Sequence, residues 1–210
     1  MSANEANVIA VIGATGSGKG VYIKNYELKK SDTRLLIWDY MQEYGPLVDL
    51  STASLGIAMQ GLAAPKFKIA FRPSYDDKTR AKQFDVFCKA AVAVGQLRMV
   101  VEELAFVTSA SFAPAGWKAA TSIGRHKGLR LIGASQRPAQ VDKAFWSNCT
   151  EIHCGFLNYD DDQKTMARAL GVDIADIQGL EPLEYFHKNV RTKKITRGKV
   201  VIPGKPKAGA

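Results

Sequence analysis

The residues best suited to chemistry lie in the segment GATGSGKG, directly after the apolar run VIAVI. The segment fits the pattern G-x-x-x-x-G-K, whose glycines let successive backbone N–H groups face a phosphate. A helix that begins at this point would add the positive end of its dipole. We therefore predict an ATP-binding loop in which Lys19 reaches the β- and γ-phosphates. Its residues are Gly13, Ala14, Thr15, Gly16, Ser17, Gly18, Lys19 and Gly20.

One position of this loop departs from the pattern. Gly20 stands where Ser or Thr is expected, and that hydroxyl normally binds Mg²⁺. Glycine has no side chain with which to do so. A water molecule, or the hydroxyl of Ser17 or Thr15, is the substitute that the sequence offers.

A second candidate site follows the apolar run in MVVEE. An apolar strand that ends in two acids is typical of a Walker B motif. We expect Glu102 to hold Mg²⁺ through water and Glu103 to polarise the attacking water. The alternative is a pair of solvated surface glutamates.

A third candidate lies in GRHKGLRLIGASQRP, Gly124 to Pro138. Gln136 follows a predicted strand, so it could sense the γ-phosphate or position water. Arg125 precedes that strand. In a ring of subunits it could reach a neighbour's nucleotide as an arginine finger. Arg137 is the competing candidate, and simple solvation is the alternative for either arginine.

These residues need a scaffold, and the hydrophobic pattern predicts one. Helices alternate with the strands, which indicates an α/β fold with a mainly parallel sheet covered on both faces. Ligands of such sheets bind beyond the carboxyl ends of the strands. Gly13, Asp39, Glu102 and Gln136 each follow a predicted strand. The predicted strands are 8–12, 35–38, 67–71, 97–101, 129–134 and 151–156, and the predicted helices are 18–30, 79–94, 114–125 and 160–171, the last capped by Asp160.

Length and charge set the limits of this scaffold. The 210 residues suit a single α/β domain, which we place at 1–190, followed by a basic hairpin and flexible tail at 191–210. The net charge of +9 favours a polyanionic partner such as nucleic acid, although some soluble enzymes are equally basic. No stretch approaches the roughly 18 apolar residues of a membrane span, and we expect no targeting signal.

The three cysteines are expected to be reduced thiols of a cytosolic protein. Cys149, His153 and Cys154 lie close together in the sequence. Their spacing matches no common zinc motif, and their segment looks like a buried strand.

Taken together, these motifs resemble the HerA–FtsK superfamily of DNA-pumping ATPases. The order and spacing match over most of Val8 to Leu170, and a strand ending in SQRP after R-x-x-G is the most specific element. The D-x-x-x-E-Y pattern from Asp39 to Tyr44 resembles the HerA side. The resemblance implies a RecA-like P-loop NTPase core, a hexameric ring with DNA in its channel, and the cofactors ATP and Mg²⁺. It also implies the roles given above to Lys19, Glu102, Glu103, Arg125 and Gln136.

The short chain is most similar to the genome-packaging ATPases of tailless, internal-membrane viruses and phages. That resemblance implies a motor that moves double-stranded DNA into a capsid. Its partners would be DNA of any sequence, further copies of the chain, and capsid or portal-vertex proteins. It would work in the host cytoplasm and at the virion vertex. The candidate channel residues are Lys66, Lys68, Arg80 and Lys118.

Two other functions stay open. One is a filamentous-phage assembly ATPase of the zonula-occludens-toxin-like branch, although those proteins usually carry a transmembrane helix after the motor. The other is a nucleotide-binding module or small-molecule kinase with little turnover. Gly20 favours the second, whereas SQRP and Arg125 argue against it.

Overall fold

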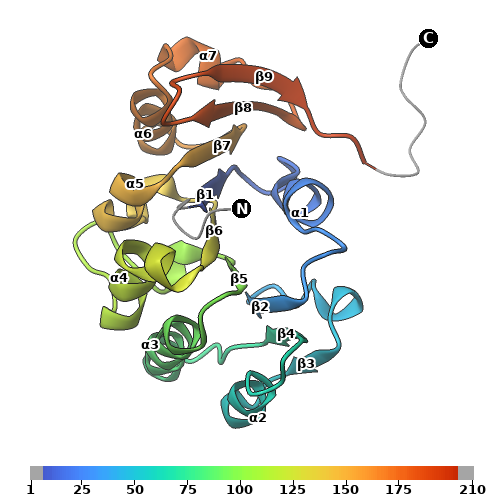
Figure 1. Cartoon of the computed structure of the whole chain (residues 1–210). Helices are drawn as coiled ribbons and strands as arrows, with labels where there is room; N and C mark the ends of the chain where they lie inside the picture. The colour runs from blue at the N-terminus through green and yellow to red at the C-terminus, as the bar shows by residue number, and fades with distance from the viewer. Residues whose placement is uncertain (1–6, 203–210) are drawn as a thin grey trace.

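The computed structural model describes residues 7–202, which form one nine-stranded sheet in the order β3-β4-β2-β5-β6-β1-β7-β8-β9. Strands β1 to β7 all run parallel, and β8 and β9 continue the sheet antiparallel (Figure 1). The carboxyl ends of the parallel strands therefore share one edge. The strands are β1 Asn7–Ile12, β2 Arg34–Trp38, β3 Leu50–Thr52, β4 Phe67–Phe71, β5 Arg98–Val101, β6 Arg130–Ser135, β7 Glu151–Gly155, β8 Glu184–Asn189 and β9 Ile195–Lys199.

Helices cover both faces of the sheet. The helices are α1 Lys19–Tyr22, α2 Leu55–Gly61, α3 Asp77–Val94, α4 Ala115–Ser122, α5 Lys143–Asn148, α6 Asp160–Leu170 and α7 Ile174–Gln178. In Figure 1, α3, α4 and α5 lie on one side of the sheet and α1 lies on the other. The larger apolar core lies beneath α3 to α7 and includes Phe84, Phe87 and Trp117, and a smaller core beneath α1 includes Tyr22 and Tyr44. The predicted two-faced α/β sheet is confirmed.

The helix predicted at 18–30 is shorter and irregular. After α1 the chain forms a π-helical turn, Ile23–Glu27, and becomes extended at Leu28. The wider turn places Ile23 fully inside the smaller core. This geometry depends on packing against the sheet. The hydrophobic periodicity of the segment alone does not show such packing.

Other elements differ at the ends and edges of the fold. The segment 41–65 contains the edge strand β3 and the short helix α2, and β3, α5 and α7 were not predicted. The prediction that Asp160 caps its helix is wrong. Tyr159 is the N-cap and makes no side-chain capping bond, while Asp160 is the first helical residue. The acidic first turn still faces the positive end of the helix dipole.

The carboxyl-terminal hairpin belongs to the sheet. The predicted division between 190 and 191 falls in the turn between β8 and β9, and these strands pair from Glu184–Lys199 to Lys188–Ile195. Beyond β9, Val200 is only 2 % exposed and packs in the smaller core. The last part of the predicted flexible tail, 203–210, lies outside the described residues.

Within 7–202, none of the helices combines the length and the apolar character that crossing a membrane would require.

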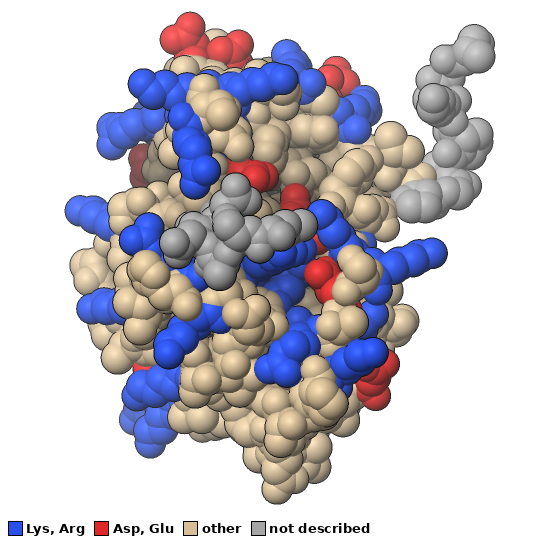
Figure 2. Space-filling model, in the orientation of Figure 1, with Lys and Arg blue, Asp and Glu red and all other residues tan. Residues whose placement is uncertain are grey.

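Lysine and arginine side chains are spread widely over the face in Figure 2, with a few acidic side chains between them.

Candidate nucleotide-binding site

The predicted phosphate loop lies at the carboxyl end of β1, in the middle of the parallel strands. Gly18 has φ 91°, in the left-handed region that favours glycine. A Cβ on Gly13 would collide with the Ser17 side chain, so that position also requires glycine. The loop therefore curls tightly over β1, and α1 begins at Lys19 with its positive end at the loop.

The Lys19 ammonium points back over the loop. Its Nζ donates hydrogen bonds to the carbonyl oxygens of Gly13 (2.7 Å) and Ala14 (3.3 Å). Burial lowers the pKa of Lys19, while the negative charges of Glu103 and Glu102 act in the opposite direction. A cation at this position is well placed to exchange the two carbonyls for phosphate oxygens.

Gln136 joins the phosphate loop to the acidic pair. Thr15 Oγ1 donates to Gln136 Oε1 (2.8 Å), and Gln136 Nε2 donates to Glu103 Oε1 (2.8 Å). Glu103 has a left-handed backbone, φ 51° and ψ 56°. Such a conformation is unfavourable for a residue with a side chain, and it typically persists at functional sites. The strand ends thus bring together Thr15, Gln136 and Glu103 as the sequence predicted.

Glu102 is buried to the same extent as Glu103, and the charges of other acids act on it. Burial, followed by the charge of Asp39, raises the pKa of Glu102 to about 7. Its Oε2 accepts a hydrogen bond of 3.4 Å from the Met41 backbone N–H. This concentration of carboxylates favours a bound cation, and carboxylate oxygens are ligands that Mg²⁺ prefers.

A loop after β2 closes one side of the site. The Asp39 carboxylate, which is fully buried, accepts hydrogen bonds from the backbone N–H groups of Glu43 (2.8 Å) and Tyr44 (3.1 Å). The Glu43 carboxylate forms an ion pair with Lys24 at 2.9 Å. No role was predicted for Glu43. The D-x-x-x-E-Y pattern was the only sequence signal that included it.

The site contains a cavity of about 360 Å³. Ser17 does not line this cavity: it is 1 % exposed, and its Oγ has no hydrogen-bond partner in the described part of the chain. Leu183 and Ile202, from the carboxyl-terminal region, do line it and were not predicted. The lining residues are Ala14, Thr15, Gly16, Gly18, Lys19, Gly20, Val21, Ile23, Lys24, Met41, Glu43, Glu102, Glu103, Ala134, Gln136, Leu183 and Ile202.

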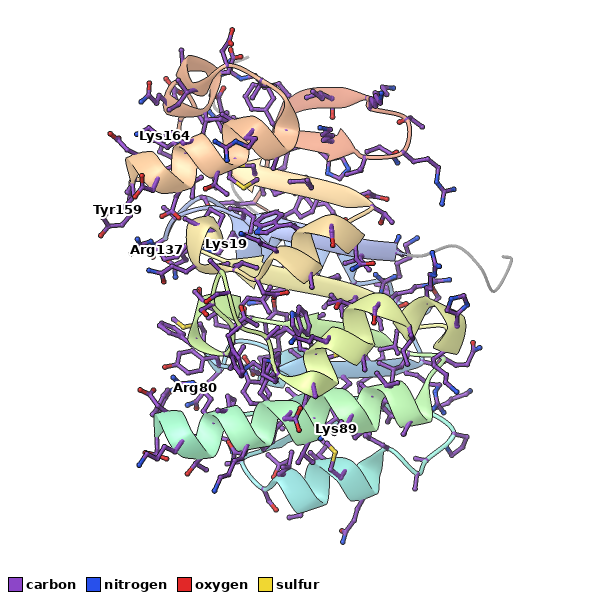
Figure 3. The ribbon with its side chains drawn as sticks, turned by 90° about the vertical axis from the view of Figure 1, so that its left-hand side faces the viewer. Lys19, Arg80, Lys89, Arg137, Tyr159 and Lys164 are labelled. Carbon is purple, nitrogen blue, oxygen red and sulfur yellow. The ribbon has the colours of Figure 1, made fainter. Side chains whose placement is uncertain are left out.

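The two candidate arginines lie at opposite edges of the sheet. Arg137 follows β6 at the same edge as Lys19, as Figure 3 shows. Its Nε donates to the buried Asp162 carboxylate (2.8 Å), and its guanidinium lies 4.3 Å from the centre of the Tyr159 ring. Arg125 precedes β6 and is exposed, so the length of that strand, about 20 Å, separates it from this site. Of the predicted site residues, only Arg125 lies away from the others.

Three other predictions concern residues outside the site. The prediction that Arg80 lines a channel is wrong. Its side chain is buried (6 % exposed) and donates hydrogen bonds to the carbonyl oxygens of Tyr75 and Phe106. Lys66 and Lys118 are exposed, and Lys68 is half-buried. Among residues 7–202, no group of three or more His, Cys, Asp or Glu side chains is arranged so that it could hold a metal ion.

Comparison with known proteins agrees with this geometry. The structure of the genome-packaging NTPase B204 from Sulfolobus turreted icosahedral virus 2, in complex with AMP, matches with a TM-score of 0.75 over 96 % of this chain and 100 % of that one, at 17 % identity. The chain has an α/β P-loop NTPase fold. The bacterial conjugative coupling protein TrwB matches with a TM-score of 0.52 at 18 % identity, over 68 % of this chain and 42 % of that one. The predicted RecA-like fold class is confirmed.

Sequence comparison adds one relative. Protein P9 of Pseudoalteromonas phage PM2 is 29 % identical over 177 residues, which are 81 % of this chain and 78 % of P9. No protein-family model matches the chain. The predicted resemblance to viral genome-packaging ATPases agrees with the B204 match, which at this identity shows a shared fold, and P9 is likewise a phage protein.

Proposed function

We propose that this chain is an ATPase that moves viral double-stranded DNA into a capsid. The observation that carries the proposal is the hydrogen-bonded series Thr15–Gln136–Glu103 beside the Lys19 ammonium. This series connects a phosphate loop to a carboxylate base. Structures of the genome-packaging NTPase B204 in complex with AMP, AMPPCP and ATP-gammaS match over 93–96 % of this chain.

Hydrolysis would begin with water between Glu103 and the γ-phosphate. Glu103 accepts a proton from the attacking water. Gln136 orients this water molecule and senses whether the γ-phosphate is present. Lys19 offsets the charge that develops on the phosphoryl oxygens. When bound, Mg²⁺ would neutralise charge on the β- and γ-phosphates. The buried carboxylate of Glu102 fits its preference for oxygen ligands and would hold it.

The arginine finger would come from a neighbouring subunit of a ring, which we propose to be a hexamer. Arg137 lies at the same edge of the sheet as the phosphate loop, but it forms an ion pair with Asp162 of its own chain. Arg125 is too far from its own phosphate loop, yet it is exposed and bonds only the adjacent His126 among the interactions described for it. We therefore assign the finger to Arg125 and a positioning role to Arg137.

DNA would bind through its phosphates and without base recognition. The net charge of +9 supports such binding, which would weaken as salt concentration rises. Lys66, Lys68 and Lys118 remain the candidate contacts. A capsid or portal-vertex protein would be the docking partner, with the motor acting in the host cytoplasm and at the virion vertex.

The test is ATP hydrolysis with and without double-stranded DNA, using K19A as the inactive control. We expect DNA of unrelated sequences to raise the wild-type rate equally, and added salt to remove the increase. A wild-type rate unaffected by DNA would contradict the motor. ATP binding without measurable turnover would instead support a nucleotide-binding module.

A further inference from the structure

Gly20 opens toward a carboxylate from another loop. A Cβ built on Gly20 would lie 3.4 Å from Glu43 Oε2 and 4.0 Å from Lys24 Nζ. In a phosphate loop this is the direction in which the Ser or Thr of the pattern carries its Mg²⁺-binding hydroxyl. The space that the missing hydroxyl would fill therefore adjoins an oxygen ligand that the sequence places elsewhere.

The backbone holds Glu43 in this place. Asp39 accepts hydrogen bonds from the N–H groups of Glu43 and Tyr44, and the Tyr44 ring is fully buried. Gln42, the residue before Glu43, has φ 58°, a left-handed conformation that an unconstrained glutamine rarely adopts. The loop is thus fixed by a buried carboxylate and a buried aromatic ring, and it aims Glu43 at Gly20.

The two hydroxyls within the loop are poor substitutes. Ser17 Oγ lies beneath the loop, and the Ser17 side chain packs against the backbones of Gly13 and Gly155 outside the cavity. Thr15 Oγ1 is bound to Gln136. Glu43, in contrast, lines the same cavity as Lys19 and Glu102.

We propose that the Glu43 carboxylate replaces the missing hydroxyl as a ligand of Mg²⁺, either directly or through one water molecule. The inference rests on the proposed function, since the metal would enter with ATP. Lys24 compensates the charge of Glu43 in the protein without nucleotide, at 2.9 Å. A carboxylate carries a full negative charge, so it can hold the cation at least as well as a neutral hydroxyl.

The experiment measures Mn²⁺ affinity from the electron paramagnetic resonance signal of the free ion, with protein saturated by the non-hydrolysed analogue AMPPCP. We expect E43Q to weaken Mn²⁺ binding about tenfold or more. Adding G20S to E43Q should recover most of the loss, because a serine side chain has room there and restores the hydroxyl. The control E184Q, which weakens the similar, partly exposed pair of Glu184 with Arg197, should leave Mn²⁺ affinity unchanged.

Two further measurements distinguish loss of a metal ligand from a general loss of nucleotide binding or of the Lys24–Glu43 ion pair. AMPPCP affinity in EDTA should be equal for wild type and E43Q, because the role of Glu43 requires the metal. K24M should keep or increase Mn²⁺ affinity. Unchanged Mn²⁺ affinity in E43Q, or an equal loss in K24M, would overturn the inference while leaving the nucleotide site intact. Failure of the wild type to bind AMPPCP at all would instead contradict the proposed function.

Discussion

The side-chain nitrogen Nε2 of Gln136 donates a hydrogen bond of 2.8 Å to Oε1 of Glu103. The same amide group accepts from Thr15 on the phosphate loop. Because an amide both donates and accepts, a movement of the loop when the γ-phosphate leaves would be transmitted to Glu103. The pair is therefore suited to couple the state of the nucleotide to the position of the base.

Removing this amide should slow hydrolysis without preventing ATP binding. We expect Q136A to lower kcat about tenfold to a hundredfold, and E103Q to lower it by at least about a hundredfold. Both variants should bind ATP with nearly wild-type affinity, because Lys19 and the loop backbone remain. Steady-state rates together with equilibrium binding check this. If Q136A lost ATP affinity and kept kcat, Gln136 would be a binding residue only.

The assignment of Arg125 to a neighbour's site can be tested by mixing variants. K19A and R125A should each be inactive alone, because every subunit interface then lacks one component. Mixed rings should regain part of the activity, since some interfaces combine an intact Lys19 with an intact Arg125. Hydrolysis rates across mixing ratios provide the measurement. Mixtures that stay as inactive as their components would contradict the trans assignment, provided that both variants still assemble.

Breaking the ion pair of Arg137 and Asp162 should lower the stability of the folded protein. The Asp162 carboxylate is fully buried, and R137A would leave it with the Ala139 N–H as its remaining bond. We expect R137A to reduce the free energy of unfolding by about 1–3 kcal/mol. Urea denaturation monitored by circular dichroism measures the change. The control R125A should alter stability by less than about 0.5 kcal/mol, as is usual for exposed positions.

The buried His153 ring should make the protein sensitive to acid. It is 1 % exposed and stacks on Tyr22 with ring centres 3.6 Å apart, and burial lowers the pKa of His153 to about 3. The unfolded chain binds this proton near pH 6.5. The contribution is thus fully present above pH 6.5 and is lost as the pH falls toward 3, by at most about 1.4 kcal/mol per pH unit.

H153F should therefore flatten the decline of stability between pH 6.5 and 4, because phenylalanine keeps the stack and cannot be protonated. Urea denaturation at a series of pH values gives the comparison. The ion pair of Glu151 with His187 is present in both proteins, so the difference between the two curves reports the replacement of His153. Parallel curves would contradict the prediction.

The sequence by itself determined the phosphate loop and the sheet that carries it. Gly13 to Lys19 are contiguous, so their spacing alone specifies a curled loop after a buried strand. The residues after the other central strands follow the same logic, since parallel strands place their carboxyl ends at one edge. For this reason Asp39, Glu102, Glu103 and Gln136 were found without a structure.

Only the tertiary structure decided which of these residues touch. Thr15 and Gln136 are 121 positions apart, and Arg137 and Asp162 are 25 apart. Their contacts depend on strand order and on the loops between strands, which hydrophobic periodicity does not encode. Glu43 is the clearest case: its position opposite Gly20 depends on hydrogen bonds that fold the loop after β2 onto Asp39. A residue missing from one motif can thus be replaced by a side chain from another element, and only the folded chain, through packing and these hydrogen bonds, brings the two together.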